Sequence, residues 1–195
     1  MKIHLSIAVL LSLTANLAGP QNAVGQSIAV DRIVSVATGD WNKDGEPDTA
    51  MLVAPPQDGD DMGVMFLLGE RYTGRQVMHS FAPSKIWGNV VTAGQVPKVV
   101  ALKNGSIAVT SENAAIGRNR WQQQLTIAFR DNRFVVAGFT HSYYDTLNND
   151  DIGNCDLNML SGRGKVNDKA VRFKRSSVEL TNWKDSLGIS VCGFY

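Results

Sequence analysis

Oxygen-bearing side chains stand at alternate positions in one short stretch of the sequence, GDWNKDGEPD, which covers residues 39–48. They belong to Asp40, Asn42, Asp44, Glu46 and Asp48. Carboxylates this close repel one another unless a cation, hydrogen bonds or solvent relieve them. Counted from Asp40, side-chain oxygens fall at positions 1, 3, 5 and 9, position 7 offers a backbone carbonyl, and the glycine at position 6 allows a sharp turn. This spacing predicts a cage for a hard cation.

Calcium is the cation that such a loop fits best. Ca²⁺ accepts six to eight oxygen ligands in flexible geometry, whereas Mg²⁺ needs a tighter octahedron and keeps more of its waters. The loop contains no Cys or His, which argues against zinc or copper. The alternative is a polar turn without a metal, because Asp, Asn and Gly are favoured in turns anyway.

The loop is not an EF-hand, because Met51 stands at position 12, where that motif has a bidentate Glu. The pattern strand, D-x-N-x-D-G-x-x-D, strand instead resembles the calcium loop of FG-GAP and VCBS-type repeats, over about residues 34–53. Those repeats come in series and this chain has one copy, so the resemblance does not extend to a whole propeller. It implies a calcium ligand set of Asp40, Asn42, Asp44, the carbonyl of Glu46, and Asp48.

No catalytic group is predicted. Outside the first 25 residues the only histidines are His79 and His141, and we expect both to be structural. His141 is adjacent to Ser142 and near Asp145, but neighbours along a strand point to opposite faces. The sequence contains no G-x-S-x-G, H-E-x-x-H or C-x-x-C motif. A pair of carboxylates for glycoside hydrolysis stays possible, because the distance between two such groups in the fold cannot be read from the sequence.

Two further polar stretches are predicted to be loops. YYDTLNNDDIGNCD, residues 143–156, is rich in oxygen but lacks the alternate spacing, which favours a solvated loop beside a disulfide. DGDDMG, residues 58–63, follows Pro55 and Pro56 and is most simply a polar loop. The four tryptophans line a ligand groove or pack in the core, and the sequence does not decide between them.

The first 25 residues have the parts of a secretory signal: Lys2, an apolar run, and small residues ending in the best cleavage pattern, Ala23-Val24-Gly25. We therefore expect a single domain over residues 26–195 in the periplasm or outside the cell, without stable membrane insertion. In such a compartment the two cysteines, Cys155 and Cys192, are expected to form one disulfide.

Charge excludes one class of partner. Loss of the signal removes one base, Lys2, and no acid, so that 18 basic residues face 18 acidic ones. A nucleic-acid-binding protein usually has a strong basic excess, so we expect no nucleic acid partner. The expected partner is an unidentified protein or glycan.

The fold class follows from short apolar runs that alternate with turn signals. Hairpins are predicted at Asn104-Gly105, as a type I′ turn, at Asp131-Asn132 and at Asn167-Asp168. In the middle hairpin Leu125, Ile127 and Phe129 fall on one face by period two. The sequence predicts an all-β protein in which antiparallel hairpins form a sandwich or a small barrel-like or propeller-like assembly.

These inferences give an exported calcium-binding β-domain that acts as a binding or structural module. The alternative is a hydrolase of cell-envelope polysaccharide or peptide. Two carboxylates facing each other in a cleft would favour the hydrolase, whereas a groove without a converging acid and base would favour the module.

Overall fold

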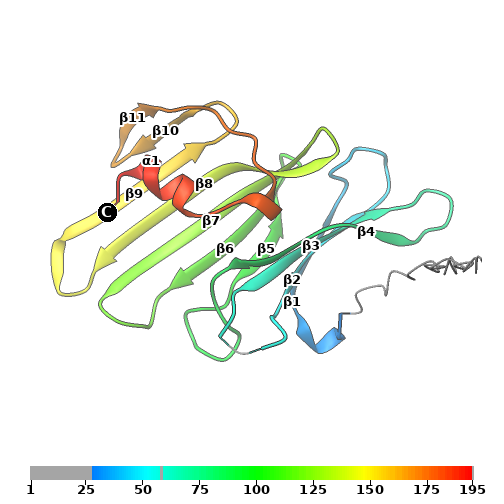
Figure 1. Cartoon of the computed structure of the whole chain (residues 1–195), viewed down its shortest axis with the longest axis horizontal. Coiled ribbons are helices and arrows are strands. Elements are labelled where there is room, and N and C mark those ends of the chain that lie inside the picture. Colours follow the sequence, from blue (N-terminus) through cyan, green and yellow to red (C-terminus); the bar gives the residue numbers. More distant parts are fainter. Residues whose placement is uncertain (1–27, 58, 195) are drawn as a thin grey trace, which may run out of the picture.

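The computed structural model describes residues 28–57 and 59–194 (Figure 1). The predicted signal segment, residues 1–25, lies outside the described residues. The described chain is antiparallel β structure in two open sheets, which confirms the predicted all-β class and is consistent with a sandwich, one of the predicted assemblies, rather than a closed barrel. None of its helices has the length and apolar content needed to cross a membrane.

The smaller sheet has four strands in the order in which they occur along the chain, preceded by a short 3-10 helix, η1 (Val30–Arg32). The strands are β1 (Ile33–Gly39), β2 (Asp48–Val53), β3 (Met62–Gly69) and β4 (Gln76–Ile86). The β2 and β3 strands are almost continuously buried, because both of their faces pack against protein. The candidate loop joins β1 to β2, as the sequence pattern predicts.

The larger sheet is a meander of seven strands, with β5 and β11 at its edges (Figure 1). Its strands are β5 (Lys98–Ala101), β6 (Ile107–Asn113), β7 (Asn119–Arg130), β8 (Arg133–Asp145), β9 (Asn148–Asn158), β10 (Arg163–Val166) and β11 (Lys169–Arg172). Along β7, Leu125 and Ile127 are fully buried, which confirms their predicted face.

The two sheets share one apolar core. Phe66 of β3 stacks on Phe134 of β8 at a ring-centroid distance of 3.9 Å, and Trp41 contacts the same ring edge-on at 6.3 Å. At the seam between the sheets the Ser35 hydroxyl oxygen accepts a hydrogen bond of 3.2 Å from the Val99 amide. The core therefore holds the candidate loop through Trp41, which lies within the loop.

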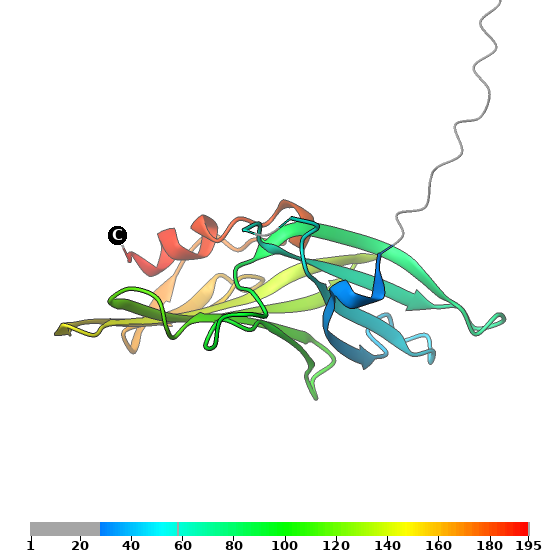
Figure 2. The ribbon, with the colours of Figure 1, turned by 90° about the horizontal axis from the view of Figure 1, so that it is seen from below.

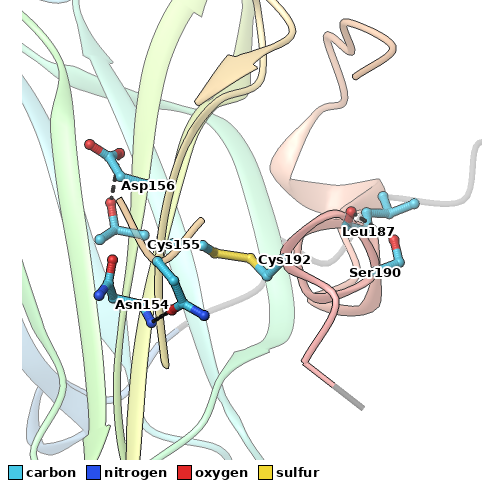
Figure 3. The surroundings of a disulfide bond; sticks show 8 residues. Asn154, Cys155, Asp156, Leu187, Ser190 and Cys192 are labelled. Carbon is cyan, nitrogen blue, oxygen red and sulfur yellow. Dashed lines mark hydrogen bonds between the residues drawn. A yellow bond between two sulfur atoms is a disulfide. The ribbon is translucent and has the colours of Figure 1, made fainter. Parts of the chain in front are cut away.

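The C-terminal segment covers one face of the larger sheet and leaves the other face open (Figure 2). It contains η2 (Leu180–Asn182) and α1 (Ser186–Cys192), and Gly193 ends α1 in the left-handed conformation typical of a helix C-cap. Cys192 of α1 is bonded to Cys155 of β9, with Cα atoms 5.8 Å apart (Figure 3). The disulfide prediction is confirmed, and the bridge holds α1 against the larger sheet.

The hairpin predictions have mixed outcomes. Positive φ angles at Asp131 and Asn132, and at Asn167 and Asp168, fit the type I′ geometry of two-residue turns. At Asn104-Gly105 the hairpin is present, but the type I′ prediction is wrong, because only the glycine has positive φ.

Candidate metal loop and neighbouring sites

Asp48 anchors the candidate loop to the smaller sheet. Its side chain is fully buried at the start of β2. One carboxylate oxygen accepts the Trp41 amide at 2.8 Å, and the other accepts the Gly69 amide at 3.1 Å, from the end of β3. Asp48 therefore ties both ends of the loop to β3, a role that its predicted function as a calcium ligand did not include.

Three exposed or half-buried side chains gather on the outer part of the loop. Asp40 and Asn42 each place one side-chain oxygen 3.1 Å from the Asp44 amide nitrogen, which donates to both. The second Asp40 oxygen accepts the Gly45 amide at 3.1 Å, and the Asn42 side-chain amide donates to Asp44 at 2.7 Å. Gly45 allows this path with a φ of 92°. The structure thus brings Asp40, Asn42 and Asp44 together as predicted.

Backbone amides and one arginine stabilise the negative charge of this loop. The Glu46 amide donates to the Asp44 carboxylate at 2.8 Å and, with the Asn42 side chain, lowers the pKa of Asp44 below its usual value. Arg71, from the turn between β3 and β4, donates to the Asp44 carbonyl at 2.8 Å and lies 3.6 Å from the Glu46 carboxylate. Asp44 is therefore kept ionised, as a calcium ligand must be.

The chemistry of the donor set fits a hard cation. Its side-chain ligands are carboxylate and amide oxygens, which Ca²⁺ prefers, and the predicted fifth ligand is the Glu46 carbonyl. Over residues 28–57 and 59–194, no three His, Cys, Asp or Glu side chains are grouped closely enough to hold a metal ion by themselves. The calcium ligand set, which mixes carboxylates with an amide and a carbonyl, stays a prediction.

The second acidic stretch is not a solvated loop, so that prediction is wrong. Most of it forms β9, paired along its length with β8. Asp145 is buried, accepts the Leu147 amide at 2.8 Å and pairs with the Arg118 guanidinium at 2.6 Å. These hydrogen bonds, the Leu147 amide first, lower the pKa of Asp145. This carboxylate therefore fixes the β8–β9 turn.

His141 is a core residue, in agreement with its predicted structural role. It lies on the covered face of the larger sheet, parallel to the Phe139 ring at a centroid distance of 6.0 Å and near Trp121 at 6.1 Å. Neither ring nitrogen has a hydrogen-bond partner among the described residues. Burial lowers the pKa of His141, and the nearby charge of Asp185 opposes that shift.

Asp185, just before α1, is the carboxylate that sequence reasoning missed. It accepts hydrogen bonds of 2.8 Å from the Trp183 indole and from the Gln123 side chain. Its charge also raises the pKa of Asp61, an effect that comes second to the burial of Asp61 itself. Gln123 and Asp61 are far from Asp185 in the sequence, so local spacing could not predict these interactions.

The open face of the larger sheet carries a polar groove of about 370 Å³. Cross-strand pairs place Thr110, Gln124 and Thr140 in one row and Glu112, Gln122 and Ser142 in the next. Amide and hydroxyl side chains line this groove, and no tryptophan does. Of the four tryptophans that could have lined a ligand groove, Trp41 and Trp183 are buried in the core. No histidine lines it.

Comparison with known proteins found no similar protein. The chain matches no protein-family model, no curated protein and no solved structure. The resemblance to FG-GAP and VCBS-type calcium loops therefore stays a prediction that rests on the loop residues.

Proposed function

We propose that this protein is an exported β-module that binds one Ca²⁺ in the loop between β1 and β2. One observation carries the proposal: Asp40, Asn42 and Asp44 gather their side-chain oxygens on the outside of a loop that Asp48 anchors from within. The ion would neutralise carboxylates that hydrogen bonds relieve only in part. Its chemical contribution is positive charge and cross-linking of the loop.

The affinity need not be high. Extracellular calcium modules bind with dissociation constants of about 10⁻⁴ to 10⁻³ M, because their surroundings supply free calcium. The Arg71 guanidinium lies against the same loop and competes with a bound cation for the negative charge of the loop. We therefore expect a dissociation constant at the weak end of that range.

The open groove supports a binding or structural role for the module in the periplasm or outside the cell. Its neutral hydrogen-bonding side chains suit an unidentified protein or glycan partner, which presents hydroxyls and amides of its own. Lys98 and Glu112 give the groove one charge of each sign, which accords with the nearly neutral composition.

Isothermal titration calorimetry tests calcium binding directly. Purified protein is titrated with Ca²⁺ and, in parallel, with Mg²⁺. We expect one Ca²⁺ per chain at submillimolar to millimolar affinity and weaker binding of Mg²⁺. Asp44→Ala should abolish the heat, whereas Arg71→Ala should tighten binding because it removes a competing positive charge. Equal Ca²⁺ binding by wild type and Asp44→Ala would remove the loop from the proposal.

A hydrolase remains the second candidate because of one pair of carboxylates. Burial raises the pKa of Asp61, and the charge of Asp185, which two hydrogen bonds hold in place, raises it further. Glycoside hydrolases use a pair of carboxyl groups, one of which has a raised pKa. Release of soluble fragments from purified cell-wall polysaccharide by wild type, and its loss in Asp61→Asn with an unchanged fold, would favour this candidate over the module.

A further inference from the structure

A second pocket lies at the end of the smaller sheet opposite the calcium loop. The β1–β2 loop is at one end, whereas the β2–β3 turn and the segment after β4 are at the other, because the strands are antiparallel. The pocket has a volume of about 450 Å³. Five of its lining residues carry the inference: Asp60, Asp61, Trp87, Asn89 and Gln95.

Gln95 has a buried hydrogen-bond donor without an acceptor in the part of the protein that the structure describes. The Asn89 side-chain oxygen accepts the amides of Val91 at 3.0 Å and Thr92 at 2.6 Å, so its NH₂ group must face Gln95. That group donates to the Gln95 oxygen at 2.5 Å, which fixes the orientation of the Gln95 amide. Gln95 is 1% exposed, and its Nε2 has no partner among the described residues. An unpaired donor this deep costs free energy unless an oxygen of a water or of a ligand accepts its hydrogen bond.

The same pocket contains two carboxylates, Asp60 and Asp61. Asp60 is exposed and Asp61 is half-buried, and neither forms an ion pair with a basic residue of the described ranges. Burial raises the pKa of Asp61, and the charges of Asp185 and Asp60 raise it further. A bound cation would stabilise the ionised form of Asp61 against both its burial and the repulsion from Asp185 and Asp60.

Trp87 supplies a ring surface suited to a cation. Its ring lies 4.9 Å from that of Trp121, at an angle of 58°, which holds it in place while it stays half-exposed at the pocket. An ammonium group over an indole face is attracted by the ring quadrupole. The Gln95 NH₂ group cannot coordinate a metal, so the ligand that satisfies all of these groups is organic.

We propose that this pocket binds an organic ligand that carries a primary ammonium group and, close to it, an oxygen acceptor. The ammonium group lies between the Asp60 and Asp61 carboxylates and the Trp87 ring, and the acceptor oxygen takes the hydrogen bond of Gln95 Nε2. Outside the cytoplasm, this chemistry is found on amino-sugar glycans and on lysine-containing peptides. The site goes beyond the proposed calcium function and does not depend on it.

The test is calorimetry on the purified protein with calcium held constant and saturating, so that the loop contributes no difference. Two amine probes are used, a glucosamine trisaccharide and the N-terminally acetylated peptide acetyl-Gly-Lys-Gly amide, whose only ammonium group is on the lysine side chain. Their neutral counterparts are the fully N-acetylated trisaccharide and acetyl-Gly-norleucine-Gly amide. The variants are Asp60→Asn with Asp61→Asn, which removes both charges at nearly constant shape, and a matched control with Asp150→Asn and Asp151→Asn in exposed β9.

At least one amine probe should bind, and its neutral counterpart should bind about tenfold more weakly or worse, as expected for loss of a charge-assisted contact. The double Asn variant should lose about tenfold in affinity, whereas the β9 control should match wild type. The probe that binds identifies the source as glycan or peptide. Absence of heat from both amine probes at concentrations on the order of ten millimolar overturns the proposal. Equal binding of the neutral counterparts, or no effect of the double Asn variant, also overturns it.

Discussion

At the scale of single residues, His141 makes the protein sensitive to acid. Its pKa in the folded state lies below the ordinary value of 6.5 because burial disfavours the charged ring. Below about pH 6.5 the unfolded chain therefore binds more protons than the folded one. The stability that neutral His141 contributes should be fully present above pH 6.5 and should be lost as the pH falls through the lowered pKa of the folded state.

Urea unfolding of wild type and His141→Phe between pH 7.5 and 5 measures this effect. We expect wild type to lose more stability than the variant, because Phe keeps the aromatic packing and cannot be protonated. If both lose stability in parallel, the acid sensitivity comes from other groups and the assignment to His141 is wrong.

Asp48 is predicted to matter more for folding than any other residue of the loop. Asp48→Ala leaves the buried Trp41 amide and the part-buried Gly69 amide without an acceptor, which should cost about 2–4 kcal/mol of unfolding free energy. Asp40→Ala is the control, because its exposed partners regain hydrogen bonds from water and the loss should be smaller. Both variants are unfolded in urea with a chelator present. Equal losses would show that Asp48 is not the anchor.

At the scale of elements, the disulfide holds α1 on the sheet. The bridge closes a sequence separation of 37 residues, and the chain-entropy model gives it about 4 kcal/mol. We expect Cys155→Ser with Cys192→Ser to lower the free energy of unfolding by that order and to speed hydrogen exchange in α1 before the central strands. Slow exchange in α1 of the double variant would show that apolar packing alone holds the helix.

Turn chemistry explains both the successes and the error of the hairpin predictions. Asp131 and Asn132 both adopt positive φ, a conformation that Asp and Asn tolerate better than most residues. At Asn104 the strands are joined differently: the Leu102 amide donates to the Ser106 carbonyl, which leaves three residues in the turn instead of two. The Asn104 side chain then accepts the Ser106 amide at 3.0 Å, so only Gly105 needs positive φ.

Sequence reasoning reached the local part of the candidate site and missed the rest for a physical reason. Asp40, Asn42 and Asp44 come together because they share one tight loop, so their spacing carries the information. Arg71 reaches the loop from another hairpin, and the charge of Asp185 acts on Asp61 from a distant part of the chain. Such contacts depend on packing, as does α1, whose seven residues are too few to show a helical period.

At the scale of the whole molecule, the calcium loop and the proposed amine pocket lie at opposite ends of the smaller sheet, and the polar groove lies on the larger one. This arrangement suits a module that calcium stabilises while other surfaces bind. Binding to the folded state alone adds RT ln(1 + [L]/Kd), so that calcium at a hundred times Kd should contribute about 2.7 kcal/mol. In the proposed function, the loop therefore links the stability of the module to the calcium concentration around it.

Thermal unfolding in calcium and in chelator tests this central claim most directly. We expect wild type to melt at a higher temperature in calcium, Asp44→Ala to lose that difference, and Asp44→Asn, which keeps an oxygen ligand, to retain part of it. Asp151→Ala, an exposed carboxylate of β9, should keep the full wild-type difference. A wild-type melting temperature that is the same in millimolar calcium and in chelator would contradict the account and leave the loop as a hydrogen-bonded turn.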